Sequence, residues 1–414
     1  MSTTTRPAQT MGATINEMNV LQKMKANVAG KISMLMINTG LADSPIVKGF
    51  SKQEGIIQFM LIMIGFLLFV IFWWGFNKLY LDSANCSNIE AIYKTPTLIT
   101  DVNLTNPTNQ YLLRDYYIKT AYNCCASGKN KNDFVNVCAL KNCIKQGVRA
   151  LDFEIYSVSN KPVIAVSSVT SYNIKESYNM VPFDDAMNVV ENYAFAGSNC
   201  PNPNDPLILI FRIKSDNKTI YDLMAKSIYN RLENRLLGKK YSYESNGYNL
   251  GSIKLSKLMN KVIIIVDKAN PLFIDTLLNE YVNMASNTPF MRTLRFNDIK
   301  YTPDAEELTN FNKQNMTLAL PNISANVENY SPALVQAYGC QFIGMSFQNF
   351  DDKMEFYALL FDQAGSAFIL KPERLRYVEV IIPAAELAPE QVSLAPRFTN
   401  PPGTDGNSNM TIVY

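Results

Sequence analysis

Residues 147–156, GVRALDFEIY, place two acidic residues inside an otherwise apolar run. If this run is a β-strand, Asp152 and Glu154 point to the same face, because side chains alternate along a strand. Two carboxylates on a buried face need a cation or hydrogen-bond donors, since unpaired buried charge is costly. The stretch therefore predicts both a buried strand and a polar site on it.

Further apolar runs after this stretch alternate with segments of helical periodicity. The predicted strands are 162–168, 206–213, 261–268, 339–347 and 366–372, and the predicted helices are 183–195, 218–237, 271–285 and 351–361. Alternating strands and helices indicate an α/β fold with a parallel sheet. The number of units favours a distorted (β/α)8 TIM-type barrel over an open sheet, with chemistry at the carboxyl ends of the strands.

Composition excludes several classes of function. The 414 residues carry 38 basic and 36 acidic side chains, a net charge of +2, so no basic excess points to nucleic acid. The chain contains no histidine. Any acid–base mechanism must therefore run without the side chain that most often titrates near neutral pH.

Residues 56–76, IIQFMLIMIGFLLFVIFWWGF, contain no charged side chain. A helix needs about 20 such residues to cross a bilayer, so we predict a single transmembrane helix before the barrel. The preceding residues 1–55 form an N-terminal arm in which apolar residues spaced by three and four predict an amphipathic helix. Residues 77–109, rich in polar residues with two prolines, are expected to be a linker.

The charges flanking the apolar segment favour a cytoplasmic N-terminus, because the arm carries more lysine and arginine than the region after the segment. The barrel would then lie outside or in a lumen. All seven cysteines follow the segment, which agrees with export and disulfides, although buried free thiols are the alternative. Residues 378–414 contain several prolines and are expected to form an extended C-terminal tail.

Four short blocks, in order, resemble the Y half of the eukaryotic-type phosphoinositide-specific phospholipase C catalytic domain: NYSP, YGCQ, SFQN and AFILKP, within residues 329–376. DYYIKTAYNCC, GVRALDFEIY and PLILIFRI are similar to successive blocks of the X half. The resemblance covers residues 110–377, with the X half at about 110–268 and the Y half at about 290–377. It implies a distorted TIM-type barrel, in agreement with the alternation of elements.

The resemblance implies that the catalytic positions are degenerate. The family histidine that stabilises the transition state falls on Tyr122, and the general-acid histidine falls on Val166. Losing a general acid or base typically costs about 10²–10⁴-fold in rate. On this basis we expect a protein that is not an enzyme, with residual phosphodiesterase activity as an alternative.

The calcium ligands of the family fall on Asn123, Asp152, Glu154 and Arg212. A guanidinium cannot ligate calcium, but it can pair with two carboxylates. We therefore expect no bound calcium or other metal, and we hypothesise that Arg212 forms a salt-bridged plug with Asp152 and Glu154 in the former metal site.

Three further residues are candidates for binding a lipid head group. Tyr330 matches the family tyrosine that packs on inositol, Lys268 lies near the family's phosphate contacts, and Lys214 matches a polar position. An inositol phosphate or phosphoinositide binding module is therefore one alternative function. The main expectation is a membrane-anchored structural or interaction protein. The Asn-rich composition and the anchor resemble a virion membrane protein of a large DNA virus, with capsid or envelope partners.

Overall fold

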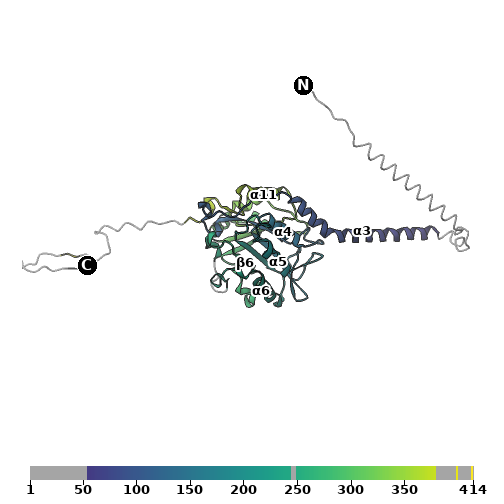
Figure 1. Ribbon diagram of the computed structural model, residues 1–414, viewed down its shortest axis with the longest axis horizontal. Coiled ribbons are helices and arrows are strands. Elements are labelled where there is room, and N and C mark those ends of the chain that lie inside the picture. The colour runs from purple at the N-terminus through teal and green to yellow at the C-terminus, as the bar shows by residue number, and fades with distance from the viewer. Residues whose placement is uncertain (1–53, 244–248, 379–397, 400–411, 414) are drawn as a thin grey trace, which may run out of the picture. The chain divides into compact units, whose positions relative to one another are not determined.

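The computed structural model describes residues 54–243, 249–378, 398–399 and 412–413 (Figure 1). The chain divides into two units, Met1–Leu81 and Asp82–Tyr414. The predicted amphipathic helix of the arm lies outside the described residues, as does most of the predicted tail. Within the tail, β12 (Phe398–Thr399) pairs antiparallel with β13 (Ile412–Val413).

Helix α3 spans Glu54–Ile92 and contains the predicted membrane segment. Among the described residues, α3 is the one helix that is long and apolar enough to cross a membrane. None of its most apolar stretch is buried by protein. The sequence predicts that the helix ends at residue 76 and that a linker follows. The helix instead continues for sixteen more residues, to Ile92.

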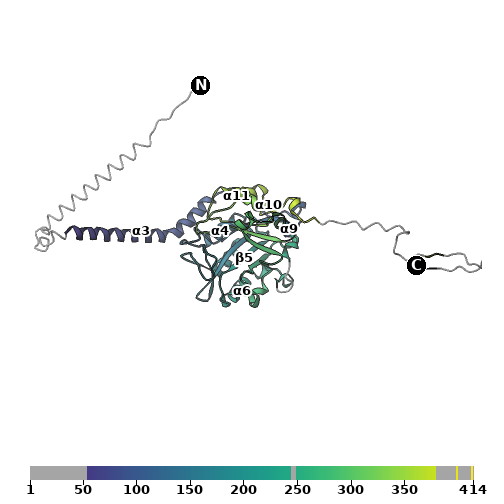
Figure 2. The same ribbon diagram turned by 180° about the vertical axis from the view of Figure 1, so that it is seen from behind.

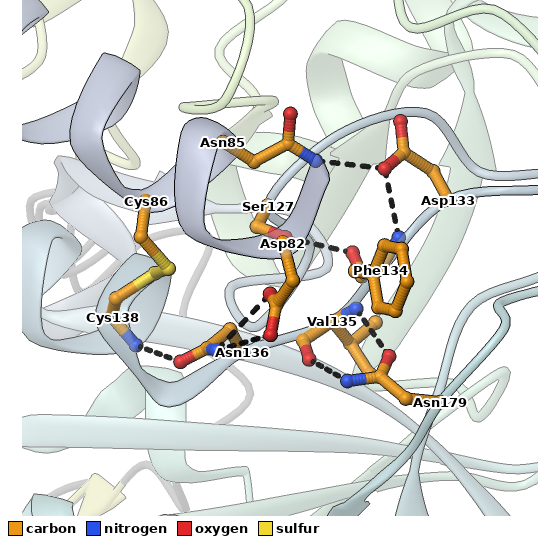
Figure 3. Close-up of a disulfide and its surroundings, with 10 residues drawn as sticks. All are labelled: Asp82, Asn85, Cys86, Ser127, Asp133, Phe134, Val135, Asn136, Cys138 and Asn179. Carbon is orange, nitrogen blue, oxygen red and sulfur yellow. Dashed lines mark hydrogen bonds between the residues drawn. A yellow bond between two sulfur atoms is a disulfide. The ribbon is translucent and has the colours of Figure 1, made fainter. Parts of the chain in front are cut away.

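The continuation exists because the last turns of α3 have partners on the barrel (Figure 3). Cys86 forms a disulfide with Cys138, at the start of helix α4 (Val137–Lys145). The side chain of Asn136, the N-cap of α4, donates to both carboxylate oxygens of Asp82, each at 3.1 Å. Polar residues that resemble a linker in sequence are therefore contact residues of a helix.

Two more contacts fix this end of α3. The amide of Asn85 donates to Asp133 Oδ1 at 2.7 Å, and Ile89 is buried against the barrel. After the helix, the hydroxyl of Tyr93 donates to the carbonyl of Phe347. All of these partners lie in segments that follow strands of the barrel at their carboxyl ends.

Eight strands form a nearly closed parallel barrel, which confirms the predicted TIM-type fold. Their order is β7-β6-β5-β2-β1-β10-β9-β8. Every neighbouring pair along this path is parallel. The strands are β1 (Tyr116–Ala121), β2 (Ala150–Val158), β5 (Leu207–Ile213), β6 (Val262–Asp267), β7 (Met284–Ser286), β8 (Met291–Arg295), β9 (Met316–Leu320) and β10 (Phe342–Met345).

Helices cover the outside of the strands (Figures 1 and 2). Besides α4 they are α5 (Phe183–Tyr193), α6 (Thr219–Leu232), α8 (Phe296–Lys300), α9 (Ala305–Gln314), α10 (Pro332–Ala337) and α11 (Asp352–Ala364). Buried positions recur at helical spacing, as at Phe183, Met187 and Val190 of α5. The ring of Phe183 contacts Phe211 on β5, so the apolar stripe of the helix packs on the outer face of the sheet.

Three features depart from the predicted series of elements. The predicted strand 162–168 is the short β3 (Lys161–Ile164), which pairs antiparallel with β2 and with β4 (Val181–Pro182). The predicted strand 366–372 is β11 (Phe368–Leu370), antiparallel to β1. The predicted helix 271–285 consists of two short 3₁₀ helices, Pro271–Asp275 and Leu277–Glu280, followed by β7.

The register between β2 and β5 positions the polar residues inside the barrel. Glu154 lies directly opposite Arg212, and Asp152 lies opposite Ile210. Because side chains alternate, Asp152, Glu154 and Arg212 share one face. The intervening Phe153 and Phe211 contact each other on the opposite face, with ring centroids 5.9 Å apart. The apolar alternation of both strands thus places the charges in the barrel interior.

Candidate functional site

The candidate site lies at the carboxyl ends of β1, β2 and β5, which we call the barrel mouth. Asp152 and Glu154 come from β2, Arg212 comes from β5, and Asn123 follows β1. The structure therefore brings together all four residues that the resemblance assigns to the former metal site. Each of the four is at most 3 % exposed.

The guanidinium of Arg212 contacts all three oxygen-bearing side chains. Its Nε and Nη2 donate to Asp152 Oδ1 and Oδ2 at 2.8 and 2.9 Å, which is a bidentate pair. Nη2 also donates to Asn123 Oδ1 at 2.6 Å, and Nη1 donates to Glu154 Oε2 at 3.3 Å. The Tyr156 hydroxyl donates to Glu154 Oε1 at 2.6 Å. One cation therefore faces two carboxylates.

Burial and charge act in opposite directions on Arg212. Burial alone lowers the pKa of a guanidinium, because it disfavours the charged form. The neighbouring carboxylates of Asp152 and Glu154 outweigh burial and hold the pKa of Arg212 well above its ordinary value. Arg212 is consequently a permanent cation in the folded protein.

Asn123 has the backbone geometry that a tight turn at the end of a strand requires. Its φ is +45°, a left-handed conformation that asparagine adopts more readily than most residues. The turn lets its backbone N–H donate to Asp152 Oδ2 at 3.0 Å. Its side-chain Nδ2 is buried without a hydrogen-bond partner among the described residues. A donor at the mouth is thus unused by the protein.

Tyr122 contacts two guanidiniums. The Cζ atoms of Arg212 and Arg295 lie 5.0 and 5.6 Å from the centre of its ring. Arg295, the last residue of β8, also donates from Nη1 to the Tyr122 hydroxyl at 3.3 Å and to the Pro321 carbonyl at 2.9 Å. Arg295 is not predicted from the sequence, because nothing in its local sequence, MRTLRF, places it beside the mouth.

Lys214 follows β5 directly and is half-buried. Burial lowers the pKa of its amino group, and the positive charge of Arg212 lowers it further, while Glu154 and Asp267 oppose this. The Nζ atom lies 5.2 Å from the centre of the Tyr172 ring. Arg212, Arg295 and Lys214 therefore give the mouth three basic groups against the two carboxylates of Asp152 and Glu154.

The other predicted site residues contact different partners from those of Arg212, Arg295 and Lys214. Val166 is buried, and its carbonyl accepts from the N–H groups of Glu176 and Ser177. Lys268 donates to the Tyr243 hydroxyl at 3.2 Å. Tyr330 is buried, donates to the Ala319 carbonyl and stacks on Phe296. The predicted roles of Lys268 and Tyr330 in head-group binding stay predictions.

The residues at the mouth do not fit a calcium ion. Calcium prefers six to eight oxygen ligands. The Oδ1 of Asn123, both carboxylate oxygens of Asp152 and the Oε2 of Glu154 accept hydrogen bonds from Arg212, and the Oε1 of Glu154 accepts from Tyr156. Among the described residues, no group of three or more His, Cys, Asp or Glu side chains is arranged to hold a metal. We therefore derive no chemistry through a metal at this site.

Comparison with known proteins identifies the family. The profile described as phosphatidylinositol-specific phospholipase C, X domain, matches residues 109–268, and the Y-domain profile matches residues 280–374. The chain belongs to this family. These matches confirm the resemblance and lie close to the predicted limits of the two halves. No curated protein sequence matches the chain.

Solved structures give the same fold. The crystal structures of PLC21 from S. officinalis and from L. pealei match with TM-scores of 0.53 and 0.54, each at 19% sequence identity. The matches cover 70% and 68% of this chain but only 40% of each of those chains. The chain thus spans about two fifths of the length of these relatives, and the likeness supports the barrel alone.

The family assignment corrects one prediction. The expectation that the chain is not an enzyme is wrong, because both matching profiles and both structural neighbours are phospholipases C, which are enzymes. The inference rested on Tyr122 and Val166 replacing two histidines. Replacement of two side chains does not exclude catalysis by the other ionisable groups that the barrel places at its mouth.

Proposed function

We propose that the chain is a membrane-anchored phospholipase C-like protein that binds the phosphate of an inositol phospholipid head group at the barrel mouth without calcium. The observation that carries this proposal is the set of basic groups at the mouth: Arg212 and Arg295 lie over the ring of Tyr122, and Lys214 follows β5 directly after Arg212 and Ile213. Guanidinium groups bind phosphate oxygens through paired, charge-assisted hydrogen bonds. The unused Nδ2 of Asn123 offers one more donor.

The apolar part of α3 supports the anchor. The proposed topology has a cytoplasmic N-terminus and the barrel on the outer or lumenal side of the membrane. The Cys86–Cys138 disulfide supports this side, because disulfides persist in oxidising compartments. A virion membrane and capsid or envelope partners are further proposals from the sequence, and head-group binding does not depend on them.

Calcium-independent cleavage of the phosphodiester is a second proposed function, favoured by the family match and by the lowered pKa of Lys214. In this reaction a head-group hydroxyl attacks phosphorus and gives its proton to Lys214 Nζ, which acts in its deprotonated form; the lowered pKa of Lys214 favours that form. The bond from phosphorus to the lipid oxygen breaks, and that oxygen takes the hydroxyl proton of Tyr122. Arg295 stabilises the resulting phenolate, which regains its proton from Lys214.

Binding is tested with glycerophosphoinositol, a soluble head-group analogue, by calorimetry on the full chain in detergent micelles. Arg295→Met and Lys214→Met should each weaken binding by about tenfold, the size expected for one charged hydrogen bond. Lys257→Met, an exposed lysine elsewhere on the barrel, is the matched control. Absence of saturable binding, or equal binding by all variants, would refute the proposal.

Cleavage is tested separately, on phosphatidylinositol in mixed micelles with either a calcium chelator or added calcium. We expect slow release of a phosphorylated inositol that is equal in both conditions. Lys214→Met and Tyr122→Phe should abolish it, while Lys257→Met should leave it unchanged. A rate that requires calcium, or that survives both substitutions, would contradict this chemistry without affecting the binding result.

A further inference from the structure

A second concave site lies on the flank of the barrel, formed only by residues of the unit that starts at Asp82. It has a volume of about 500 Å³, within the usual range of ligand pockets. Three segments line it: the end of α3 and the turn after it at 90–97, the last turn of α4 at 142–146, and the connection 197–201 that follows α5. We call it the flank cavity.

The flank cavity is separate from the mouth. The C-terminal end of α4 precedes β2, and the connection 197–201 precedes β5, so both segments lie toward the amino-terminal ends of the strands. Chemistry in such barrels belongs to the carboxyl ends. None of the residues lining the flank cavity contacts Arg212, Asp152 or Glu154 among the interactions of the described residues.

One wall of the cavity contains an unused hydrogen-bond donor. Asn142 of α4 is only 5 % exposed and lines the cavity, and its Nδ2 has no hydrogen-bond partner among the described residues. A buried donor without an acceptor has lost its hydrogen bonds to water and gained none in the protein. An acceptor atom of a ligand in the cavity would supply the missing hydrogen bond.

The charge around the cavity is positive. Lys94 and Lys145 line it, both are exposed, and neither forms an ion pair within the part of the chain that the structure describes. Behind the wall, Arg149 donates from Nη2 to the Sγ of Cys200, a lining residue, at 2.8 Å. Among the described residues no carboxylate forms an ion pair or hydrogen bond with Arg149, although Asp205 and Asp101 lie near enough to act on its charge.

The carbonyls at the end of α4 do not oppose an anion strongly, because they are already used. The carbonyl of Ile144 accepts from Gly147, and that of Gln146 accepts from the buried Nζ of Lys119 at 2.8 Å. The one carboxylate among the lining residues is that of Glu90, which is exposed and can accept hydrogen bonds from ligand hydroxyls.

We propose that the flank cavity binds a small polyol that carries a phosphate or carboxylate group. Lys94, Lys145 and the Nδ2 of Asn142 bind the anionic group, and Glu90 accepts from the hydroxyls. Volume, an orphaned buried donor and two unpaired cations are three independent properties that this ligand class satisfies together. The site is distinct from the head-group site and does not depend on it.

The test uses the full chain in detergent micelles and three probes: glycerol 3-phosphate, citrate and glycerol. Saturable calorimetric binding of glycerol 3-phosphate or of citrate is expected, and the tighter of the two identifies the anionic group. Neutral glycerol should not bind. Lys94→Met and Lys145→Met should each weaken the binding by about tenfold. Asn142→Leu, which removes the orphaned donor, should weaken it as well.

Arg295→Met at the mouth is the matched control and should leave this binding unchanged. If Arg295→Met abolishes binding and Lys94→Met does not, the anion occupies the mouth and the flank site is refuted. Absence of saturable binding of both anions at millimolar concentration refutes it too. Each variant is checked for an unchanged melting temperature without ligand, so that misfolding is recognised. If Asn142→Leu does not fold, the two lysine variants decide the result.

Discussion

Arg212 and Arg149 are two buried guanidiniums of one barrel with opposite surroundings. Arg212 lies at the carboxyl end of β5, 3 % exposed, and faces the carboxylates of Asp152 and Glu154. Arg149 directly precedes β2 and is fully buried. It donates to the carbonyls of Ala194 and Asn202 and to the Sγ of Cys200.

The pKa values of the two arginines shift in opposite directions. Burial lowers the pKa of Arg149, and Cys200 and Asp205 only partly oppose that effect. The pKa of Arg212 is raised because two carboxylates outweigh the same burial. The charge of the partner groups, rather than the depth of burial, therefore decides the role of each buried arginine. Arg212 neutralises two carboxylates, and Arg149 holds loop carbonyls in place by hydrogen bonds.

Of the two arginines, Arg212 should contribute more to the free energy of unfolding. Arg212→Met leaves two buried carboxylates without a cation, so the free energy of unfolding should fall by about 3–5 kcal/mol. Chemical unfolding of the full chain in detergent measures this. The control is Arg231→Met, which removes a partly exposed pair with Asp184 and should cost less than about 1 kcal/mol. Equal losses in the two variants would show that Asp152 and Glu154 do not need the arginine.

Arg149→Met should cost less than Arg212→Met, although Arg149 is at least as buried. The substitution leaves two carbonyls and the Sγ of Cys200 without a donor, and the loss of such neutral partners typically costs about 1–3 kcal/mol. The same unfolding measurement applies, with Arg231→Met again as the control. A loss larger than that of Arg212→Met would overturn the conclusion that partner charge outweighs burial.

Lys371 extends the comparison to pH, because it resembles Arg149 in its surroundings. Its Nζ donates to the carbonyls of Asn312 and Gly339, and burial lowers its pKa to about 7. Between that value and the ordinary 10.5, the unfolded chain binds a proton that the folded chain does not. Stability should therefore rise with pH in this window, by up to about 1.4 kcal/mol per pH unit.

Lys371→Met should reduce this rise when the free energies of unfolding at about pH 7 and pH 9 are compared. Lys119, whose pKa burial lowers to about 8, should retain part of the slope in the variant. Lys257→Met is the control and should keep the full slope. If Lys371→Met has the same slope as the unsubstituted chain, Lys371 is not buried in a neutral form.

Calcium gives the smallest expected effect. Arg212→Glu removes the cation and adds a third carboxylate, so calcium should stabilise this variant by about 1 kcal/mol at a concentration a few times above its Kd. The unsubstituted chain should show no change in melting temperature with calcium. Tight, stoichiometric calcium binding by the unsubstituted chain would show that Arg212 leaves the site when the metal arrives.

The sequence predicted the parts of the fold that local patterns determine. Strands β2, β5 and β6 are mostly apolar runs with few charged residues, and the alternation of side chains along a strand is enough to place Asp152 and Glu154 on one face. It did not predict β7 or β8, which are short and gain their stability from pairing with strands distant in sequence. Such pairing leaves little signal in local periodicity.

The site was predicted in part for the same reason. Asn123, Asp152, Glu154 and Arg212 followed from family position and strand alternation. Arg295 could not, because its place beside Tyr122 depends on how β8 joins the far end of the strand order. The Cys86–Cys138 pair was equally hidden, since seven cysteines allow many pairings and spacing does not select among them.

The disulfide between α3 and α4 bears on which parts of the barrel become connected first during synthesis. Cys86 and Cys138 are 52 residues apart, and the loop they close contains β1 together with Tyr122 and Asn123. Closing a loop of this length restricts the unfolded chain by about 4 kcal/mol in the chain-entropy account. In an oxidising compartment, this covalent loop can form before the ribosome has added β5. One side of the mouth is then tethered to α3 while the strand carrying Arg212 is still to be synthesised.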